Sequence, residues 1–264
     1  EVGSITPEPR DGNTGSPQWP DTSEEFQHYG FGVNAWSMPN AGFAATAKAL
    51  KEVQSPHPIV VNIAGFTPED FAEGVKVFES LDNVAAISLN LGCPNAEKNI
   101  IAYSLQFIRK ILEALNELKP TKPIWVKLSP YITEAQRDQL QLLLHCQTGA
   151  DVDMSEVPTA SEGFLEEVLY RLIWHPFVKA VIFANTLGNV KIIDPKTGKP
   201  ALSVNNGKGG LSGDFLRENI VLPSLIYHHK QANFLDFKWE KDVAKEYVGK
   251  LGVKTPSVET LIAN

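Results

Sequence analysis

Short apolar runs alternate with amphipathic helical patterns along most of this chain, and this alternation limits its fold more than any other feature. The run at residues 59–64 is rich in β-branched residues and lies between a proline and a glycine, which is typical of a strand buried on both faces. Thr67 then precedes Pro68, with Asp70 three positions after Thr67, a pattern that predicts a helix N-terminus. A buried strand followed by a capped helix is the basic unit of a parallel β/α fold.

The same unit recurs along the chain, about five times in all. Further strands are predicted over 84–91, 123–128 and 178–184, with an earlier one over 30–34. Helices are predicted over 43–53, 68–78, 101–118 and from Thr133 to about His145. Two stretches interrupt the pattern: residues 146–161 are predicted to be a polar insertion, and residues 190–210 a long loop. The sequence therefore predicts an α/β protein with a parallel sheet.

Composition narrows the class of protein. A chain of 264 residues with 43% hydrophobic and 21% charged residues can bury a large core and is not a disordered tail. No apolar run approaches about 18 residues, so no membrane-spanning helix is expected. A formal charge of −7 and a pI near 5.4 argue against nucleic acid as the main partner. The two cysteines, Cys93 and Cys146, are too few for a disulfide scaffold or a four-cysteine zinc site and favour a reducing compartment.

The beginning of the chain carries no targeting signal that we can identify. It starts at Glu1 rather than Met, so we expect either a fragment or a processed chain. The first 20 residues are rich in Pro and Gly, and they lack the apolar segment of a signal peptide and the Arg-rich composition of a transit peptide.

Polar residues follow the predicted strands, where the carboxyl ends of a parallel sheet meet and where such folds place their chemistry. Asparagine offers donors and an acceptor without charge, so several convergent amides can bind a flat heterocycle such as a pyrimidine. A single Asn in a turn is more often structural, and both interpretations stay open. The amides at these strand ends belong to Asn34, Asn90, Asn95, Asn185 and Asn189.

Two further strand ends carry reactive side chains. Cys93 lies between Gly92 and Pro94, where a thiol can act as a base or nucleophile, although a lone cysteine is often a small buried hydrophobe. Cys146, on a helix tail, is expected to be structural. Lys127 ends an apolar strand, where an ammonium needs a partner, either an anionic cofactor such as a reduced flavin or a neighbouring acid.

A pair of glycines, Gly209 and Gly210, precedes a helix predicted to begin near Asp214. Glycines before a helix can expose backbone N–H groups to phosphate or flavin oxygens. Such pairs are also common in ordinary loops, so this signal is weak when taken alone.

Taken together, these motifs resemble the dihydroorotate dehydrogenase family. The similar segments occur in the family's order and with its spacing, at residues 2–13, 34–43, 62–71, 88–95, 123–130, 183–189 and 209–213. The resemblance implies one domain over 1–264, a (β/α)8 TIM barrel that binds FMN. It also implies the oxidation of dihydroorotate to orotate in pyrimidine biosynthesis, with a hydride moving from C6 of the substrate to the flavin.

The resemblance assigns roles to individual residues. A cysteine at position 93 marks the class 1 enzymes, in which Cys93 would be the base that removes the C5 proton. Lys127 would contact the flavin, and Gly209 and Gly210 would lie along the flavin and its ribityl chain. The residues that would bind substrate are Asn34, Asn90, Asn95, Asn185 and Thr186.

The chain departs from the family pattern at several positions. Ser37 and Met38 stand where the family commonly has glycine and leucine, and with Trp36 they are expected to crowd the substrate loop. Gly92 replaces the more usual serine before the cysteine. The family's first barrel strand, with its flavin-side lysine, is expected to precede Glu1.

The two strands whose turns bind the FMN phosphate are not found after residue 213. Instead the sequence continues into a tail that resembles the family's closing helices, with 254–261 as the last turn. Either segments are missing from the chain, or the phosphate site has been lost. This leaves FMN binding in doubt, and it leaves open sheet edges that a partner subunit could cover.

Two functional hypotheses follow. The first is a flavoenzyme of the dihydroorotate dehydrogenase type with a cysteine base, and the second is a catalytically degenerate barrel that acts as a structural or interaction subunit of a larger assembly. A dihydropyrimidine dehydrogenase is less compatible, because its iron–sulfur domains need more cysteines. Class 1 relatives lead us to expect a homodimer. The electron acceptor (fumarate, NAD through a partner, or a quinone) and a cytoplasmic or mitochondrial location stay open.

Overall fold

The computed structural model describes residues 1–93 and 99–221 of the 264. The chain divides into two compact units, Glu1–Val221 and Leu222–Asn264, and the described residues all belong to the first. The predicted single domain over 1–264 therefore extends outside the described residues, as does the tail at 254–261. Within the described residues, the strands form two five-stranded sheets.

The first sheet is parallel, and its strands follow one another in the order β1-β4-β5-β6-β8. Neighbours in this order are also successive parallel strands along the chain, which is the winding of a β/α barrel rather than that of a doubly wound open sheet. The fold is thus part of a TIM barrel, as the family resemblance implies. The strands are β1 (Val2–Ile5), β4 (Ile59–Ile63), β5 (Val84–Asn90), β6 (Ile124–Leu128) and β8 (Val178–Phe183).

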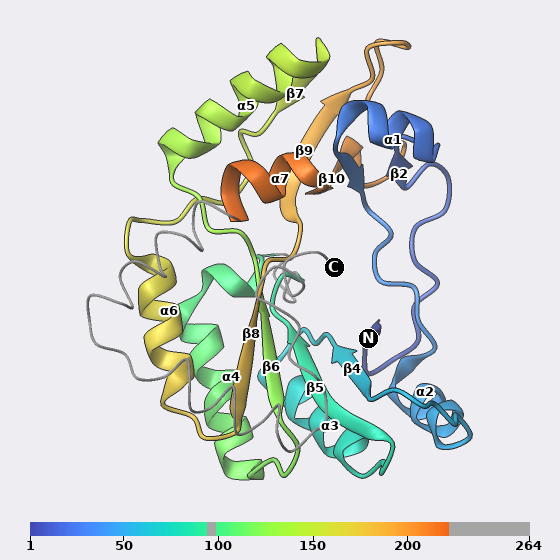
Figure 1. Ribbon diagram of the computed structural model, residues 1–264, viewed down its shortest axis with the longest axis vertical. Coiled ribbons are helices and arrows are strands. Elements are labelled where there is room, and N and C mark those ends of the chain that lie inside the picture. Colours follow the sequence, from blue (N-terminus) through green and yellow to red (C-terminus); the bar gives the residue numbers. More distant parts are fainter. Residues whose placement is uncertain (94–98, 222–264) are drawn as a thin grey trace. The chain divides into compact units, whose positions relative to one another are not determined.

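Four helices pack side by side along this sheet (Figure 1). They are α2 (Gly42–Lys51), α3 (Pro68–Glu79), α4 (Leu105–Leu118) and α6 (Phe164–Ile173). The predicted N-terminus of α3 is confirmed, because Thr67 and Asp70 form a capping box with Pro68 in the first turn. Phe71, Phe78 and other fully buried side chains of these helices form the first hydrophobic cluster with the sheet.

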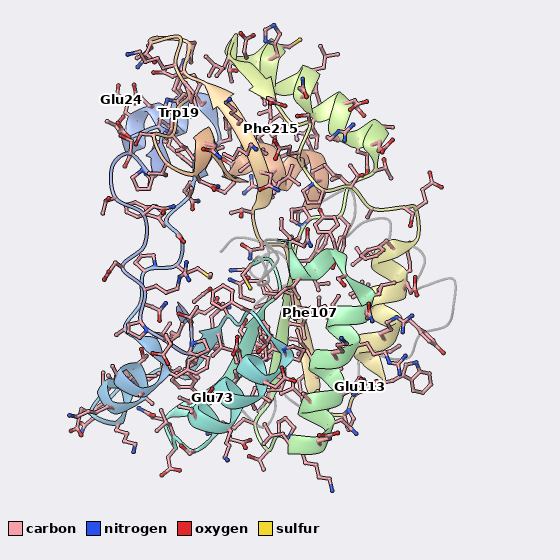
Figure 2. All side chains as sticks on the ribbon, turned by 180° about the vertical axis from the view of Figure 1, so that it is seen from behind. Trp19, Glu24, Glu73, Phe107, Glu113 and Phe215 are labelled. Atoms are coloured by element: carbon pink, nitrogen blue, oxygen red, sulfur yellow. The ribbon has the colours of Figure 1, made fainter. Side chains whose placement is uncertain are left out.

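The second sheet is antiparallel and has the order β2-β3-β10-β9-β7. Its core is a second hydrophobic cluster, in which the rings of Trp19, Phe31 and Phe215 meet; Figure 2 labels the first and the last. Helix α5 (Glu134–Thr148) packs against this sheet through Leu140 and Leu144. The strands are β2 (Gln18–Trp19), β3 (Gly32–Asn34), β7 (Asp151–Asp153), β9 (Leu187–Ile193) and β10 (Lys208–Ser212).

The remaining elements are short. They are α1 (Ser23–Tyr29), the 3-10 turns η1 (Ile101–Tyr103) and η2 (Asn205–Gly207), α7 (Asp214–Leu216) and the π-helical turn η3 (Arg217–Val221). No helix of the described residues has both the length and the apolar character to cross a bilayer.

The antiparallel sheet corrects three predictions. The strand over 30–34 exists as β3, but it pairs antiparallel with β2 and β10 and does not belong to the parallel series. The loop predicted over 190–210 includes the end of β9 and the start of β10. The polar insertion over 146–161 contains β7. Strands β3, β9 and β10 carry Gly, Asn and Lys residues, and β7 has only three residues, so these sequences resemble turns until a neighbouring strand pairs with them.

Two more predictions change in the parallel sheet. Residues 2–5 form the edge strand β1, whereas the sequence placed this segment after the first barrel strand. Helix α5 was expected as a crossover of the parallel sheet, but the crossover helix in the first cluster is α6, through Leu165, Val168 and Leu172. Helix α6 was not predicted from the sequence, although these leucines and valine have helical spacing.

Candidate functional site

One face of the parallel sheet, the polar face, carries polar side chains near the carboxyl ends of β4, β5 and β6. Buried Ile87 and Leu89 alternate along β5 with Ser88 and Asn90, and alternate residues of a strand point to opposite faces. Asn62 lies opposite Ser88 on β4, and Lys127 lies opposite Asn90 on β6, so these four polar residues share a face. A barrel interior is usually filled by branched apolar side chains. Polar groups in that position are typical of a ligand site.

Asn90, at the carboxyl end of β5, is the centre of a hydrogen-bond cluster and is only 7% exposed. Its Nδ2 donates to Ser4 Oγ at 2.7 Å. Its Oδ1 accepts from Asn185 Nδ2 at 2.7 Å and from the backbone N–H of Gly92 at 3.1 Å. The structure therefore brings Asn90 and Asn185 together, although 95 positions separate them in the sequence.

Asn185 is held from several sides. Its backbone N–H donates to the carbonyl of Leu128 at 2.7 Å, and its Oδ1 accepts from the N–H of Thr186 at 2.8 Å. A Cβ at position 92 would lie 2.3 Å from Asn185 Nδ2, so glycine is the residue that allows this approach. The departure from the family's serine at Gly92 thus has a physical reason: the Asn185 amide lies close against the backbone there.

Thr186 connects this cluster to the antiparallel sheet. A Cβ at Gly210 would lie 2.3 Å from Thr186 Oγ1, and one at Gly209 would lie 2.6 Å from the carbonyl oxygen of Asn34. Gly210 also lies opposite Asn34 in the pairing of β10 with β3. The two glycines are therefore part of a strand, not of a loop before a helix. Their missing side chains make room for Thr186 and for the Asn34 backbone.

Three polar residues of the cluster were not predicted from the sequence: Ser4, Asn62 and Ser88. Ser4 Oγ donates to Asn62 Oδ1, and Asn62 Nδ2 donates to Ser88 Oγ at 3.0 Å and to the carboxylate of Glu1 at 2.8 Å. Asn62 and Ser88 lie within runs that we interpreted as buried strands. A polar residue inside such a run was the signal that could have identified them.

Cys93 lies directly beside the amide cluster and is 4% exposed. Its Sγ is 3.0 Å from the carbonyl oxygen of Asn90 and 3.6 Å from that of Gly65. Burial raises the pKa of the Cys93 thiol from 9.0 to about 12, because the thiolate is poorly solvated there. In this arrangement the thiol is protonated at neutral pH and donates to backbone carbonyls.

Lys127 is half-buried on the polar face of the sheet, next to Asn90. Among the residues that the structure describes, none accepts a hydrogen bond from the Lys127 ammonium or forms an ion pair with it. The acidic partner considered from the sequence is therefore not found among these residues. Two positions further along, Ser129 is 2% exposed, and its Oγ also has no hydrogen-bond partner. Unpaired polar groups beside the amide cluster are where a polar ligand could bind.

The other predicted residues lie elsewhere. Asn95 is outside the described residues. Asn189 has a left-handed backbone and donates through Nδ2 to the carbonyl of Glu156 at 3.2 Å, in keeping with a structural role. Cys146 is exposed and free, so it is not part of a core. In residues 1–93 and 99–221, no three His, Cys, Asp or Glu side chains are grouped to hold a metal ion.

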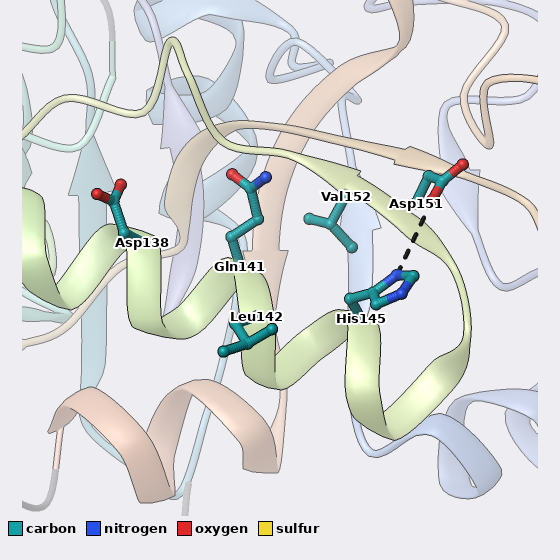
Figure 3. A pocket seen from close by; sticks show the side chains of 6 residues that line it. All are labelled: Asp138, Gln141, Leu142, His145, Asp151 and Val152. Carbon is teal, nitrogen blue, oxygen red and sulfur yellow. Dashed lines mark ion pairs between the residues drawn. The ribbon is translucent and has the colours of Figure 1, made fainter.

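A pocket of about 360 Å³ opens beside α5 and β7 (Figure 3). None of the residues that line it belongs to the amide cluster. His145 Nδ1 lies 3.9 Å from Asp151 Oδ1 and 2.9 Å from the carbonyl oxygen of Ala150. Both side chains of the pair are more than half exposed, and such pairs contribute little. The amide cluster, not this pocket, is the candidate functional site.

Fold and site together define a class: β/α-barrel proteins with polar side chains gathered at the carboxyl ends of their strands. The chain belongs to the dihydroorotate dehydrogenase family, since the model of that family, "Dihydroorotate dehydrogenase", matches residues 1–154, more than half of the chain. Its similarity to dihydroorotate dehydrogenase B proteins places it with the class 1 members.

The catalytic subunit of dihydroorotate dehydrogenase B (NAD(+)) from Anoxybacillus flavithermus is 31% identical over 206 residues, covering 76% of this chain and 54% of that protein. The protein of the same name from Geobacillus kaustophilus is 30% identical over 239 residues, covering 88% of this chain and 61% of that protein. The chain thus spans 54% and 61% of the length of these two relatives. A crystal structure of DHODH in complex with ferulenol from Eimeria tenella has a TM-score of 0.45 and 18% identity, covering 83% of this chain and 57% of that one, which is too distant to carry an argument.

Proposed function

We propose that this chain provides the substrate site of a class 1 dihydroorotate dehydrogenase, which oxidises dihydroorotate to orotate. The observation that carries the proposal is the direct hydrogen bond between Asn90 and Asn185 beside the thiol of Cys93. Two amides and a thiol from the ends of β5 and β8 converge there, and these groups suit recognition of a pyrimidine ring and removal of a proton from it. The chain spans only part of the length of its relatives, so the activity of the whole protein is also proposed here.

Recognition of the ring would use the amides that now bind one another. Asn90 Oδ1 and Asn185 Nδ2 are complementary, and a dihydropyrimidine ring offers C=O and N–H groups of the same kind. Binding would exchange the amide–amide hydrogen bond for two bonds to the ligand. Asn34 and Thr186 are connected to the cluster through Gly210, which supports their assignment to the same site. Asn95 is part of this proposal by family resemblance alone.

Cys93 would take the proton from C5 of the substrate. A thiol of pKa about 12 is a poor base at neutral pH, so the bound state must favour the thiolate more than the structure does. An ammonium favours a neighbouring thiolate, and Lys127, which lies opposite Asn90 on the adjacent strand, is our candidate for it. We therefore expect turnover to rise with pH from neutral to alkaline conditions.

FMN is the cofactor that the family implies, and the residues on the polar sheet face fit its ring system. Lys127 offers an unpaired ammonium, and Ser129 an unpaired buried hydroxyl. FMN would supply the hydride acceptor for C6 of the substrate. Gly209 and Gly210 fit a flavin less well, because Thr186 and the backbone of Asn34 already occupy the space beside these two glycines. The strands whose turns bind the phosphate in the family are not found in the sequence, so no residue of this chain is assigned to the phosphate.

The test is an absorption spectrum of the purified protein between 300 and 550 nm, with the FMN released by denaturation quantified. We expect about one FMN per chain, bleached by dihydroorotate without oxygen. Cys93→Ser should retain FMN and lose about 10²- to 10⁴-fold in the rate of bleaching at neutral pH, the usual contribution of a general base. Wild-type rates in Cys93→Ser would refute the role of the thiol.

A degenerate barrel that serves as a subunit of a larger assembly is the second candidate. The observation that favours it is the thiol itself, which is buried, protonated and bonded to backbone carbonyls. This function predicts a colourless protein that takes up neither FMN nor orotate and that is stabilised by a partner chain. The relative from Anoxybacillus is named a catalytic subunit, so an active enzyme with a partner is also part of our first proposal.

A further inference from the structure

The loop that follows Asn34 has an unusual backbone. Ser37 and Met38 have φ values of 60° and 53°, in the left-handed region that side-chain-bearing residues seldom adopt. Glycine, which the family commonly has after this Asn, adopts that region freely. A serine there needs neighbouring groups to hold the backbone in place.

Arg10 supplies such groups. Its Nε donates to the carbonyl of Ser37 at 3.0 Å, and its Nη2 donates to Ser37 Oγ at 2.8 Å. The guanidinium is also 5.3 Å from the centre of the Phe66 ring. One planar group therefore binds both polar ends of the same serine, a geometry that the single ammonium of lysine cannot reproduce.

The backbone of Arg10 is fixed to the far end of the same loop. Its N–H donates to the carbonyl of Asn40 at 2.8 Å, and the N–H of Asn40 donates back to the carbonyl of Arg10 at 2.9 Å. Asn40 Nδ2 then donates to the carbonyl of Met38 at 2.9 Å. The near end is held too, because Asn13 Nδ2 donates to the carbonyl of Ala35 at 2.7 Å.

We propose that Arg10 is a positioning residue for the substrate site: it holds Ser37 in the left-handed conformation and thereby sets the position of Asn34 and of the loop after it. Arg10 acts through the loop and needs no contact with substrate. The inference rests on the proposed function, because it assumes that the loop borders the substrate. It also explains how the chain accommodates serine where relatives have glycine.

The test compares Arg10→Met, Arg10→Lys and the double variant Arg10→Met/Ser37→Gly with the wild-type chain. Arg109→Met is the control, because Arg109 pairs with Glu113 on the exposed face of α4. Amide hydrogen exchange of peptides that cover residues 35–40 reports on the loop without any ligand. Orotate titration, together with KM and kcat for dihydroorotate, reports on the substrate site.

We expect exchange in the loop to accelerate about tenfold in Arg10→Met and Arg10→Lys, as for the loss of a charge-assisted hydrogen bond. The orotate Kd and the KM should rise by a similar factor, while FMN content and the rate at saturating substrate change by less than about twofold. The Ser37→Gly replacement should bring the double variant back to within about threefold of wild type, because glycine does not need the guanidinium.

Unchanged loop exchange in Arg10→Met, or no recovery in the double variant, would overturn the inference. So would an equal rise in orotate Kd in Arg109→Met. If the wild-type chain itself binds neither FMN nor orotate, the proposed function fails, and the exchange data then decide separately whether Arg10 holds the loop.

Discussion

The parallel and the antiparallel sheet deliver polar side chains to the candidate site in different ways. In the parallel sheet, Asn90 and Lys127 lie opposite one another at the carboxyl ends of β5 and β6. All parallel strands end at the same edge, so residues that follow them in the sequence converge in space. In the antiparallel sheet, Asn34 ends β3 while its partner Gly210 lies within β10. Strands that alternate in direction share no such edge, and their residues meet through register alone.

This difference separates two kinds of constraint. The parallel sheet positions the amides through backbone topology, which tolerates many side chains elsewhere in the strands. The antiparallel sheet adds close packing at Gly209 and Gly210, which tolerates almost no added atom, and Gly92 after β5 makes a contact of the same kind. The following predictions test these two constraints, from the largest effect on stability to the smallest.

The largest effects should come from equal truncations in the two hydrophobic clusters. Leu115 in the first cluster and Leu211 in the second are both fully buried. Leu115→Ala and Leu211→Ala should each lower the free energy of unfolding by about 2–5 kcal/mol. Because both lie in the compact unit Glu1–Val221, they should lower the midpoint of the same urea transition. Two separate transitions would show instead that the two sheets unfold independently.

The glycine contacts should give the next largest effects. Gly92→Ala and Gly210→Ala each place a Cβ 2.3 Å from a side-chain atom, of Asn185 and Thr186 respectively, and should cost about 1–3 kcal/mol of stability by overpacking. Thermal unfolding measures this cost, and orotate titration should show weaker binding in both variants.

A matched double variant tests the cause of that cost. Asn185→Ala removes Nδ2 and Cγ, the two atoms nearest to the new Cβ of Gly92→Ala, so the double variant should be more stable than the sum of the single effects predicts. Additive effects would mean that Gly92 is needed for its backbone conformation and not for its close approach to the amide.

The parts of the fold that depend on local pattern could be predicted from the sequence. The capped start of α3, the strands β4, β5, β6 and β8 and the amides at their ends follow from period and turn chemistry. The sequence also predicts that Asn90 and Lys127 lie close together, because the carboxyl ends of parallel strands meet at the same edge of a sheet.

The antiparallel sheet could not be predicted in the same way. Strand β3 has three residues, too few to show a direction, and β9 and β10 carry Gly, Asn and Lys residues that are typical of turns. The position of Arg10 depends on a serine 27 positions away with a left-handed backbone, and neither property is visible in a local pattern. Contacts of this kind exist only once the two sheets have formed.

The two cysteines allow a comparison of a buried with an exposed thiol. A pKa raised from 9.0 to about 12 leaves Cys93 about a thousandfold less thiolate at neutral pH than an ordinary thiol has. Iodoacetamide at pH 7 should therefore modify the exposed Cys146 first, with Cys93 at least about a hundredfold slower. Peptide mass spectrometry measures both sites in one sample. Fast alkylation of Cys93 would show that its thiol is already activated without ligand.

The same shift predicts a loss of stability in alkali. The folded state keeps the Cys93 thiol protonated up to about pH 12, while the unfolded chain ionises near pH 9.0. The contribution of this group is unchanged below pH 9 and falls between about pH 9 and 12, because only the unfolded state gains the charge. The free energy of unfolding of the wild type should therefore fall relative to that of Cys93→Ser as the pH rises through this range. A constant difference would mean that the thiol titrates normally.

The smallest effect on stability should come from Lys127, and Lys122, just before the same strand, provides the comparison. Lys127→Met removes an ammonium that no described residue pairs with, so the free energy of unfolding should change by less than about 0.5 kcal/mol. Lys122 donates through Nζ to the carbonyl of Val84 at the start of β5, so Lys122→Met should cost about 1 kcal/mol. FMN affinity should show the reverse order, falling about tenfold in Lys127→Met, as for the loss of one ionic hydrogen bond, and staying unchanged in Lys122→Met. If both variants lose stability and neither loses flavin, Lys127 supports the sheet and not a ligand, and the polar face of β5 and β6 would no longer indicate a cofactor site.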